Sequence, residues 1–127
     1  MTLFRFSALT FNPHKIHYSQ PWARDVEGHK DIVVHGPLNL ISILDLWRDV
    51  RAGKASGELG SGDWGESGLD SVYPEKIAYR ATSPLYAEDE YRIVLDERNR
   101  SEDGKRSAVE IITPDGNVGM KADITDV

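Results

Sequence analysis

The chain of 127 residues is long enough to bury one hydrophobic core, so we expect a single domain over residues 1–127. Its net charge of −6, with the positive residues scattered, argues against general nucleic-acid binding. The lack of cysteine excludes disulfides, thiol nucleophiles and thiolate metal sites. No apolar run approaches the roughly 20 residues needed to cross a bilayer, and the N-terminus lacks the pattern of a secretory signal. We expect no membrane partner and an intracellular location, cytoplasmic or mitochondrial.

The first expected elements are short. Residues 3–6 indicate a short strand or the beginning of a helix. Ser19 is a suitable N-cap for a short helix that ends at Gly28. Residues 31–35 include three consecutive β-branched apolar side chains and predict a buried extended segment.

The next segment predicts an apolar helix. Residues 38–50 hold eight apolar side chains after Gly36 and Pro37, and proline is favoured in the first turn of a helix. The polar side chains of this segment form a thin stripe: Asn39, Ser42, Asp45, Arg48 and Asp49. Because a helix that is apolar on most of its circumference must be covered by other structure, we expect a central, enclosed helix.

A glycine-rich stretch at 53–68 holds six of the eleven glycines and predicts a long loop. Apolar and polar residues alternate in the second half of the chain, which is typical of half-buried strands. The alternating segments are 76–82, 91–96, 109–111 and 118–124. Asp103-Gly104 and Asp115-Gly116 are suited to hairpin turns between them. A helix followed by an antiparallel meander predicts an α+β fold.

All four histidines lie within the first 35 positions, which suggests a chemical site, because histidine serves as acid, base or metal ligand near neutral pH. His14 and His17 have a spacing compatible with two metal ligands, with His29 or His35 as a third. The spacing of the others does not support a metal site, so we expect none. The alternatives to a chemical role are structural ones: His17 as a core histidine, His35 as a packing residue at the helix start and His29 as a solvated loop residue.

The residues around His17 resemble a known family. Residues 6–17 read FSALTFNPHKIH and resemble the motif of MaoC-like, R-specific enoyl-CoA hydratases, approximately F-A-x-x-S-G-D-x-N-P-[IL]-H. Aligned without gaps, His17 falls on the catalytic histidine of that family and Ala23 on its small residue six positions later. Segments 5–18, 34–38 and 83–85 look most like the branch of mesaconyl-CoA hydratases and fungal hydroxyacyl-thioester dehydratases. The resemblance covers about residues 3–125 and implies a hot-dog fold, an antiparallel sheet wrapped around one long helix.

The sequence departs from the general pattern at two positions. Asn12 stands where the family has its catalytic aspartate, and His14 stands where it has asparagine. Because asparagine is no general base, a strict Asp/His dyad is ruled out; Asn12 is also a residue type that caps turns before proline. Members of the closer branch are often double hot-dog chains of about twice this length, and this chain looks like their C-terminal half. The resemblance therefore implies a homodimer or a heteromer with another hot-dog chain.

The resemblance implies a hydratase or dehydratase acting on an enoyl or 3-hydroxyacyl thioester of coenzyme A or acyl carrier protein, with no cofactor. His17 is the predicted general base, because an imidazole with a pKa of ~6.5 is mostly neutral at pH 7. Asn12 is expected to hold the water and His14 to orient it or to shuttle a proton.

The predicted substrate-binding residues are Gly36, His35 and Pro37. The N–H of Gly36, at the positive end of the helix dipole, is expected to polarise the thioester carbonyl. A glycine there also lets a ligand approach the backbone closely, although a tight turn into a helix wants glycine anyway. Arg80 and Arg92 are candidates for coenzyme A phosphates, or simply solvent-facing charges.

Two other classes of function compete with this interpretation. The missing aspartate at Asn12 is compatible with a non-catalytic hot-dog subunit that supports a partner chain or binds an acyl ligand. A hot-dog thioesterase usually needs a carboxylate near the start of the helix, and no acidic residue lies between His35 and Ser42. We rank the thioesterase last.

Overall fold

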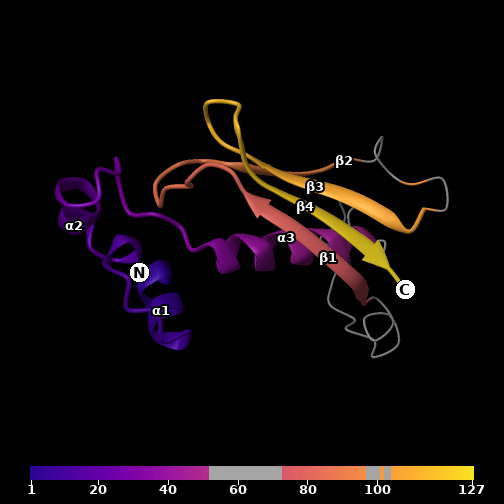
Figure 1. Ribbon diagram of the computed structural model, residues 1–127, viewed down its shortest axis with the longest axis horizontal. Coiled ribbons are helices and arrows are strands. Elements are labelled where there is room, and N and C mark those ends of the chain that lie inside the picture. The colour runs from indigo at the N-terminus through magenta and orange to yellow at the C-terminus, as the bar shows by residue number, and fades with distance from the viewer. Residues whose placement is uncertain (52–72, 97–100, 102–103) are drawn as a thin grey trace, which may run out of the picture.

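The structure of the chain, a computed structural model, describes residues 1–51, 73–96, 101 and 104–127. The helices and strands are α1 (Thr2–Leu9), the 3-10 helix η1 (Lys15–His17), α2 (Gln20–Asp25), α3 (Gly36–Arg51), β1 (Pro74–Ala81), β2 (Arg92–Asp96), β3 (Arg106–Ile112) and β4 (Val118–Asp126) (Figure 1). The loop predicted at 53–68 lies outside the described residues.

The four strands form one antiparallel sheet in the order β1-β4-β3-β2. The predicted turn at Asp115-Gly116 is confirmed, with Gly116 at a φ of +80° between β3 and β4. The expectation of a simple meander is wrong for β1, which pairs with β4 instead of β2. Residues 82–91 are the physical reason, because they form no tight turn; Tyr86 bridges back to Val33 near the N-terminal region.

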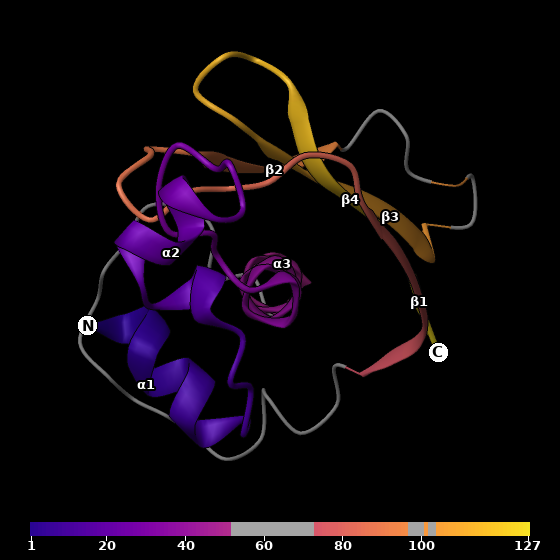
Figure 2. The same cartoon turned by 60° about the vertical axis from the view of Figure 1, so that its left-hand side comes forward.

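Helix α3 lies against one face of this sheet, which curves around it in the view along the helix (Figure 2). Ile43 and Trp47 of α3 are buried together with side chains of β3 and β4: Val109, Ile111, Met120, Ala122 and Ile124. This arrangement is the predicted α+β fold with one long central helix.

The helix is less enclosed within one chain than predicted. Only the face carrying Asn39, Ile43 and Trp47 is buried, whereas Ile41 on another face is 46% exposed. Asn39 was expected in the polar stripe, yet it is only 5% exposed. The reason is the helical period: residues four apart lie on one face, so Asn39 turns toward the sheet with Ile43 and Trp47.

The N-terminal helices gather at the end of the molecule where α3 begins (Figure 1). Residues 3–6 are helical, and the predicted cap is confirmed, since the Ser19 hydroxyl accepts a hydrogen bond from the Trp22 N–H. The helix ends at Asp25, earlier than the predicted Gly28, whose φ is +75°. Within the described part of the chain, no helix has the length and apolar character that a membrane span requires.

Candidate active site

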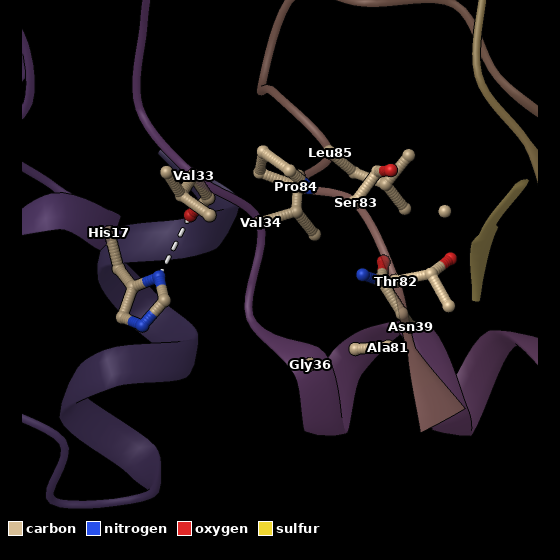
Figure 3. A pocket seen from close by; sticks show the side chains of 11 residues that line it. His17, Val33, Val34, Gly36, Asn39, Ala81, Thr82, Ser83, Pro84 and Leu85 are labelled. Atoms are coloured by element: carbon tan, nitrogen blue, oxygen red, sulfur yellow. Dashed lines mark hydrogen bonds between the residues drawn. The ribbon is translucent and has the colours of Figure 1, made fainter. Parts of the chain in front are cut away.

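A pocket of about 360 Å³ opens between the start of α3 and the segment that follows β1 (Figure 3). Two extended segments build its wall: the Val34 N–H donates to the Leu85 carbonyl and the Ala87 N–H to the Ile32 carbonyl. This pairing holds the predicted segment 31–35 against residues 85–87. The lining combines apolar side chains with a few polar groups, as expected for a small-molecule site.

His17 lines this pocket and is 8% exposed. Its Nδ1 lies 2.8 Å from the Val33 carbonyl oxygen. Because a carbonyl only accepts hydrogen bonds, Nδ1 carries the proton and Nε2 keeps the lone pair that a general base needs. Burial lowers the pKa of His17, the hydrogen bond to Val33 raises it and the nearby His14 lowers it again. The net effect is a pKa below 6.5, which keeps His17 neutral at pH 7.

His35 packs behind His17. The two rings are stacked with centroids 3.8 Å apart, and His35 Nε2 lies 2.7 Å from the Ser7 hydroxyl. Burial, with a smaller contribution from His17, lowers the pKa of His35 to about 4, so this ring is neutral at pH 7 as well. His35 supports the ring of His17 and does not itself line the pocket. The alternative of a packing residue at the helix start therefore describes its position.

Gly36 begins α3 and lines the pocket beside His17. The first N–H groups of a helix have no acceptor within the helix, so the Gly36 N–H is available to a ligand. A Cβ added to Gly36 would meet no atom within 4 Å, which means that the backbone borders open space. Pro37 is exposed in the first turn of the helix and does not line the pocket.

Asn12 and His14 lie on the turn that leads to His17. The Asn12 Oδ1 accepts a hydrogen bond from the His14 N–H at 3.1 Å, so Asn12 makes the turn-capping interaction considered as an alternative. Asn12 lines a second hollow with Phe4 and Tyr18 instead of the His17 pocket. The His14 ring centroid lies 5.7 Å from that of His17, and its Nε2 is 3.6 Å from Glu27.

The structure thus brings His14, His17 and His35 together and leaves Asn12 outside the pocket. His29 lies on a loop as expected, but it is half-buried and its Nδ1 lies 3.3 Å from the Tyr86 hydroxyl. No group of three metal-binding side chains has the geometry of a metal site among the described residues. Arg80 and Arg92, the candidates for phosphate contacts, are both exposed.

Sequence reasoning missed Asn39 and gave no pocket role to Ser83-Pro84-Leu85. All four residues line the pocket with His17. The sequence did carry a signal for Asn39, because its spacing of four from Ile43 and of eight from Trp47 places it on the buried face of the helix.

The described architecture is that of the hot-dog fold, and solved structures agree. The chain superimposes on an (R)-hydratase from A. caviae with a TM-score of 0.66 at 15% identity, covering 96% of this chain and 81% of that one. The TM-score with the HadBC (3R-hydroxyacyl-ACP dehydratase) complex from Mycobacterium tuberculosis is 0.64 at 18% identity, covering 99% and 84%.

Residues 1–87 also match the sequence model of the family described as "Hydroxyacyl-thioester dehydratase type 2", and the chain belongs to this family. The mesaconyl-C(4)-CoA hydratase of Chloroflexus aurantiacus is 31% identical over 122 residues, which cover 96% of this chain and 35% of that protein. The mitochondrial hydroxyacyl-thioester dehydratase type 2 of Schizosaccharomyces pombe is 29% identical, with 75% and 26% covered. The chain therefore spans about a third of the length of these relatives or less.

Proposed function

We propose that the chain is a hydratase or dehydratase that acts on the double bond of an enoyl or 3-hydroxyacyl thioester of coenzyme A or acyl carrier protein. One observation carries this proposal: the imidazole of His17 is buried and neutral, and the Val33 carbonyl fixes its proton on Nδ1. It shares a pocket with Gly36, the first residue of α3. The names of the relatives, a mesaconyl-CoA hydratase and a hydroxyacyl-thioester dehydratase, support the same reaction class.

In the hydration direction, His17 Nε2 takes a proton from water while the water oxygen forms a bond to C3 of the acyl chain. The electrons of the double bond move toward the thioester oxygen, where the Gly36 N–H and the dipole of α3 stabilise the developing charge. A proton is then added to C2, and the cationic imidazole formed in the first step is an acid available to deliver it. This scheme needs no cofactor.

The other predicted residues act around this centre. His14 is proposed to shuttle protons between solvent and His17, since its ring lies beside that of His17 and its side chain is 54% exposed. Asn12 is proposed as a positioning residue, because its hydrogen bond to His14 fixes the turn before His17. His35 positions the His17 ring, and Pro37 fixes the first turn of α3 behind Gly36.

The partner is proposed to be a second hot-dog chain, identical or different. Two solved structures with a similar fold are complexes, ChsH1-ChsH2 and HadBC, both from Mycobacterium tuberculosis. The uncovered apolar face of α3, with Ile41, supports this assignment. Two relatives are named as mitochondrial, which supports the proposed intracellular location.

The test is an absorbance assay of wild type and His17→Ala on a small panel of enoyl thioesters. Replacement of the base is expected to lower kcat by about 10²-fold or more while the far-UV circular dichroism spectrum is unchanged. Full activity of His17→Ala would refute the proposal. Asn12→Asp, assayed in parallel, asks whether the family aspartate raises the rate.

The second candidate, a non-catalytic hot-dog subunit, is favoured by one observation: Asn12 replaces the family aspartate and caps a turn outside the pocket. It predicts that the isolated chain is inactive on every thioester of the panel. It also predicts co-purification with a larger hot-dog chain.

A further inference from the structure

Asn39 is the feature of the pocket that the proposed mechanism leaves unused. Among the described residues that line the pocket, His17 and Asn39 are the two with buried polar side chains. Asn39 belongs to the first turns of α3, and its side chain rises into the space bordered by His17 on one side and by Thr82 to Pro84 on the other (Figure 3).

The Asn39 amide lacks a partner. Its Oδ1 is buried and accepts no hydrogen bond within the described part of the chain. A buried acceptor without a donor is costly, and native structures rarely keep one unless a ligand or water completes it. The amide can also rotate by half a turn and exchange Oδ1 with Nδ2, so the missing partner must suit either atom.

The chemistry of the pocket narrows the choice of partner. No lysine or arginine is among the described lining residues, so a carboxylate would be desolvated without a counter-charge. A carbonyl oxygen accepts from Nδ2 but leaves Oδ1 unpaired. A water molecule or a hydroxyl group both donates and accepts, and therefore satisfies either orientation of the amide.

We propose that Asn39 is a positioning residue that holds the water added to C3 of the acyl chain or, in the reverse direction, the 3-hydroxyl group that leaves. This inference rests on the proposed function and adds a second polar group to the centre around His17. The amide at the reacting oxygen is Asn39 from α3, and not Asn12, whose Oδ1 is already engaged by the His14 N–H.

The experiment compares the affinities of 3-hydroxybutyryl-CoA, each enantiomer in turn, and butyryl-CoA, which differ by the hydroxyl group alone. Isothermal titration calorimetry is done with full-length His17→Ala, so that turnover does not change the ligand. One enantiomer of the hydroxy ligand is expected to bind about three- to tenfold tighter than butyryl-CoA, the range for one net hydrogen bond. Adding Asn39→Ala, or Asn39→Leu as a variant of similar volume, is expected to abolish this preference.

Ser42→Ala in the same background is the matched control. Ser42 lies on the same helix and donates to the Leu38 carbonyl instead of lining the pocket, so the preference is expected to remain. Equal weakening of both ligands by the Asn39 variants would overturn the proposal, because the amide would then hold a group common to both, such as the thioester oxygen. An unchanged preference, or binding of neither ligand to His17→Ala, would overturn it as well.

Failure of the proposed function gives a different result. A wild-type chain that turns over no enoyl thioester, but whose binding preference still depends on Asn39, would refute the hydratase and leave the hydroxyl-binding role of Asn39 standing. Turnover that depends on His17, together with a binding preference independent of Asn39, would support the hydratase and refute the hydroxyl-binding role of Asn39.

Discussion

At the scale of single residues, three histidine rings share a small volume and yet have different environments. His35 is almost fully buried, His17 borders the pocket and His14 is half exposed. Burial penalises the charged form of the two inner rings, and the electrostatic effect of His14 lowers the pKa of His17 further. His17 therefore stays neutral over a wider pH range than a free histidine, as a general base near neutral pH requires.

This environment predicts the pH dependence of the proposed reaction, with His17 as the proposed base. The base is active when neutral, so kcat/KM for hydration is expected to fall as the pH decreases, with a midpoint below the ordinary value of 6.5. His14→Gln removes the nearby imidazole whose electrostatic effect lowers the pKa of His17, so the pKa of His17 rises and the midpoint moves to higher pH. The measurement is kcat/KM of both proteins from about pH 4.5 to about pH 8, a range that brackets the ordinary pKa of histidine.

Lys15→Gln is the control for this prediction. Lys15 is also a positive residue next to the site, but it lies over the Trp22 ring and is not among the groups that shift the pKa of His17. A midpoint above 6.5 in wild type, or an equal displacement by both variants, would contradict the assignment of His17 as the base.

The same residues show how much of the site the sequence reveals. His17 and Gly36 could be placed because each stands at a motif position or at the start of a recognisable helix. Asn39 was missed because its polarity put it in the solvent-facing stripe, although its spacing from Ile43 and Trp47 is that of one helix face, and the position of the sheet decides that this face is the buried one. The water-holding role of Asn12 depended on an aligned position, whereas its hydrogen bond to the His14 N–H is the turn-capping interaction that its residue type before Pro13 suggests.

At the scale of elements, α3 stabilises the fold through one face. Ile43 is fully buried and Ile41 is 46% exposed, although both are isoleucines on the same helix. Ile43→Ala is expected to lower the free energy of unfolding by about 2–5 kcal/mol, because it removes buried methyl groups and leaves a cavity. Ile41→Ala, the matched control, is expected to cost less than about 1 kcal/mol. Urea denaturation followed by circular dichroism at one protein concentration measures both, and equal losses would contradict this assignment of the faces.

The strands show where sequence patterns stop being sufficient. Alternation identified all four strands, and Asp115-Gly116 fixed the β3–β4 hairpin. The position of β1 beside β4 depends on the long connection through Leu85 and Tyr86, which is held by hydrogen bonds to residues 32–34. Such contacts between distant segments arise from tertiary packing, and periodicity carries no information about them.

At the scale of the whole molecule, the chain is one hot-dog unit with uncovered apolar surface. Along β1, Tyr79 is 57% exposed and Ala78 and Ala81 are also exposed, whereas Ile93 and Leu95 of the opposite edge strand β2 pack against the core. β1 is an edge strand, and an exposed edge with apolar side chains favours pairing with another sheet. A second hot-dog chain is therefore expected to pair along β1.

The exposed edge at β1 predicts a dimer that a charge on this edge disrupts. Wild type is expected to have twice the mass of one chain in sedimentation at about 5 µM, a concentration at which a dimer with a Kd below about 1 µM is mostly assembled. Tyr79→Glu places a charge on the β1 edge and is expected to give monomers. Val94→Glu places the same charge at a position that is 45% exposed on β2 and is expected to leave the dimer intact. Dissociation by Val94→Glu alone would show that the interface lies along β2 and not along β1. A monomeric wild type would mean that the chain requires a different hot-dog partner.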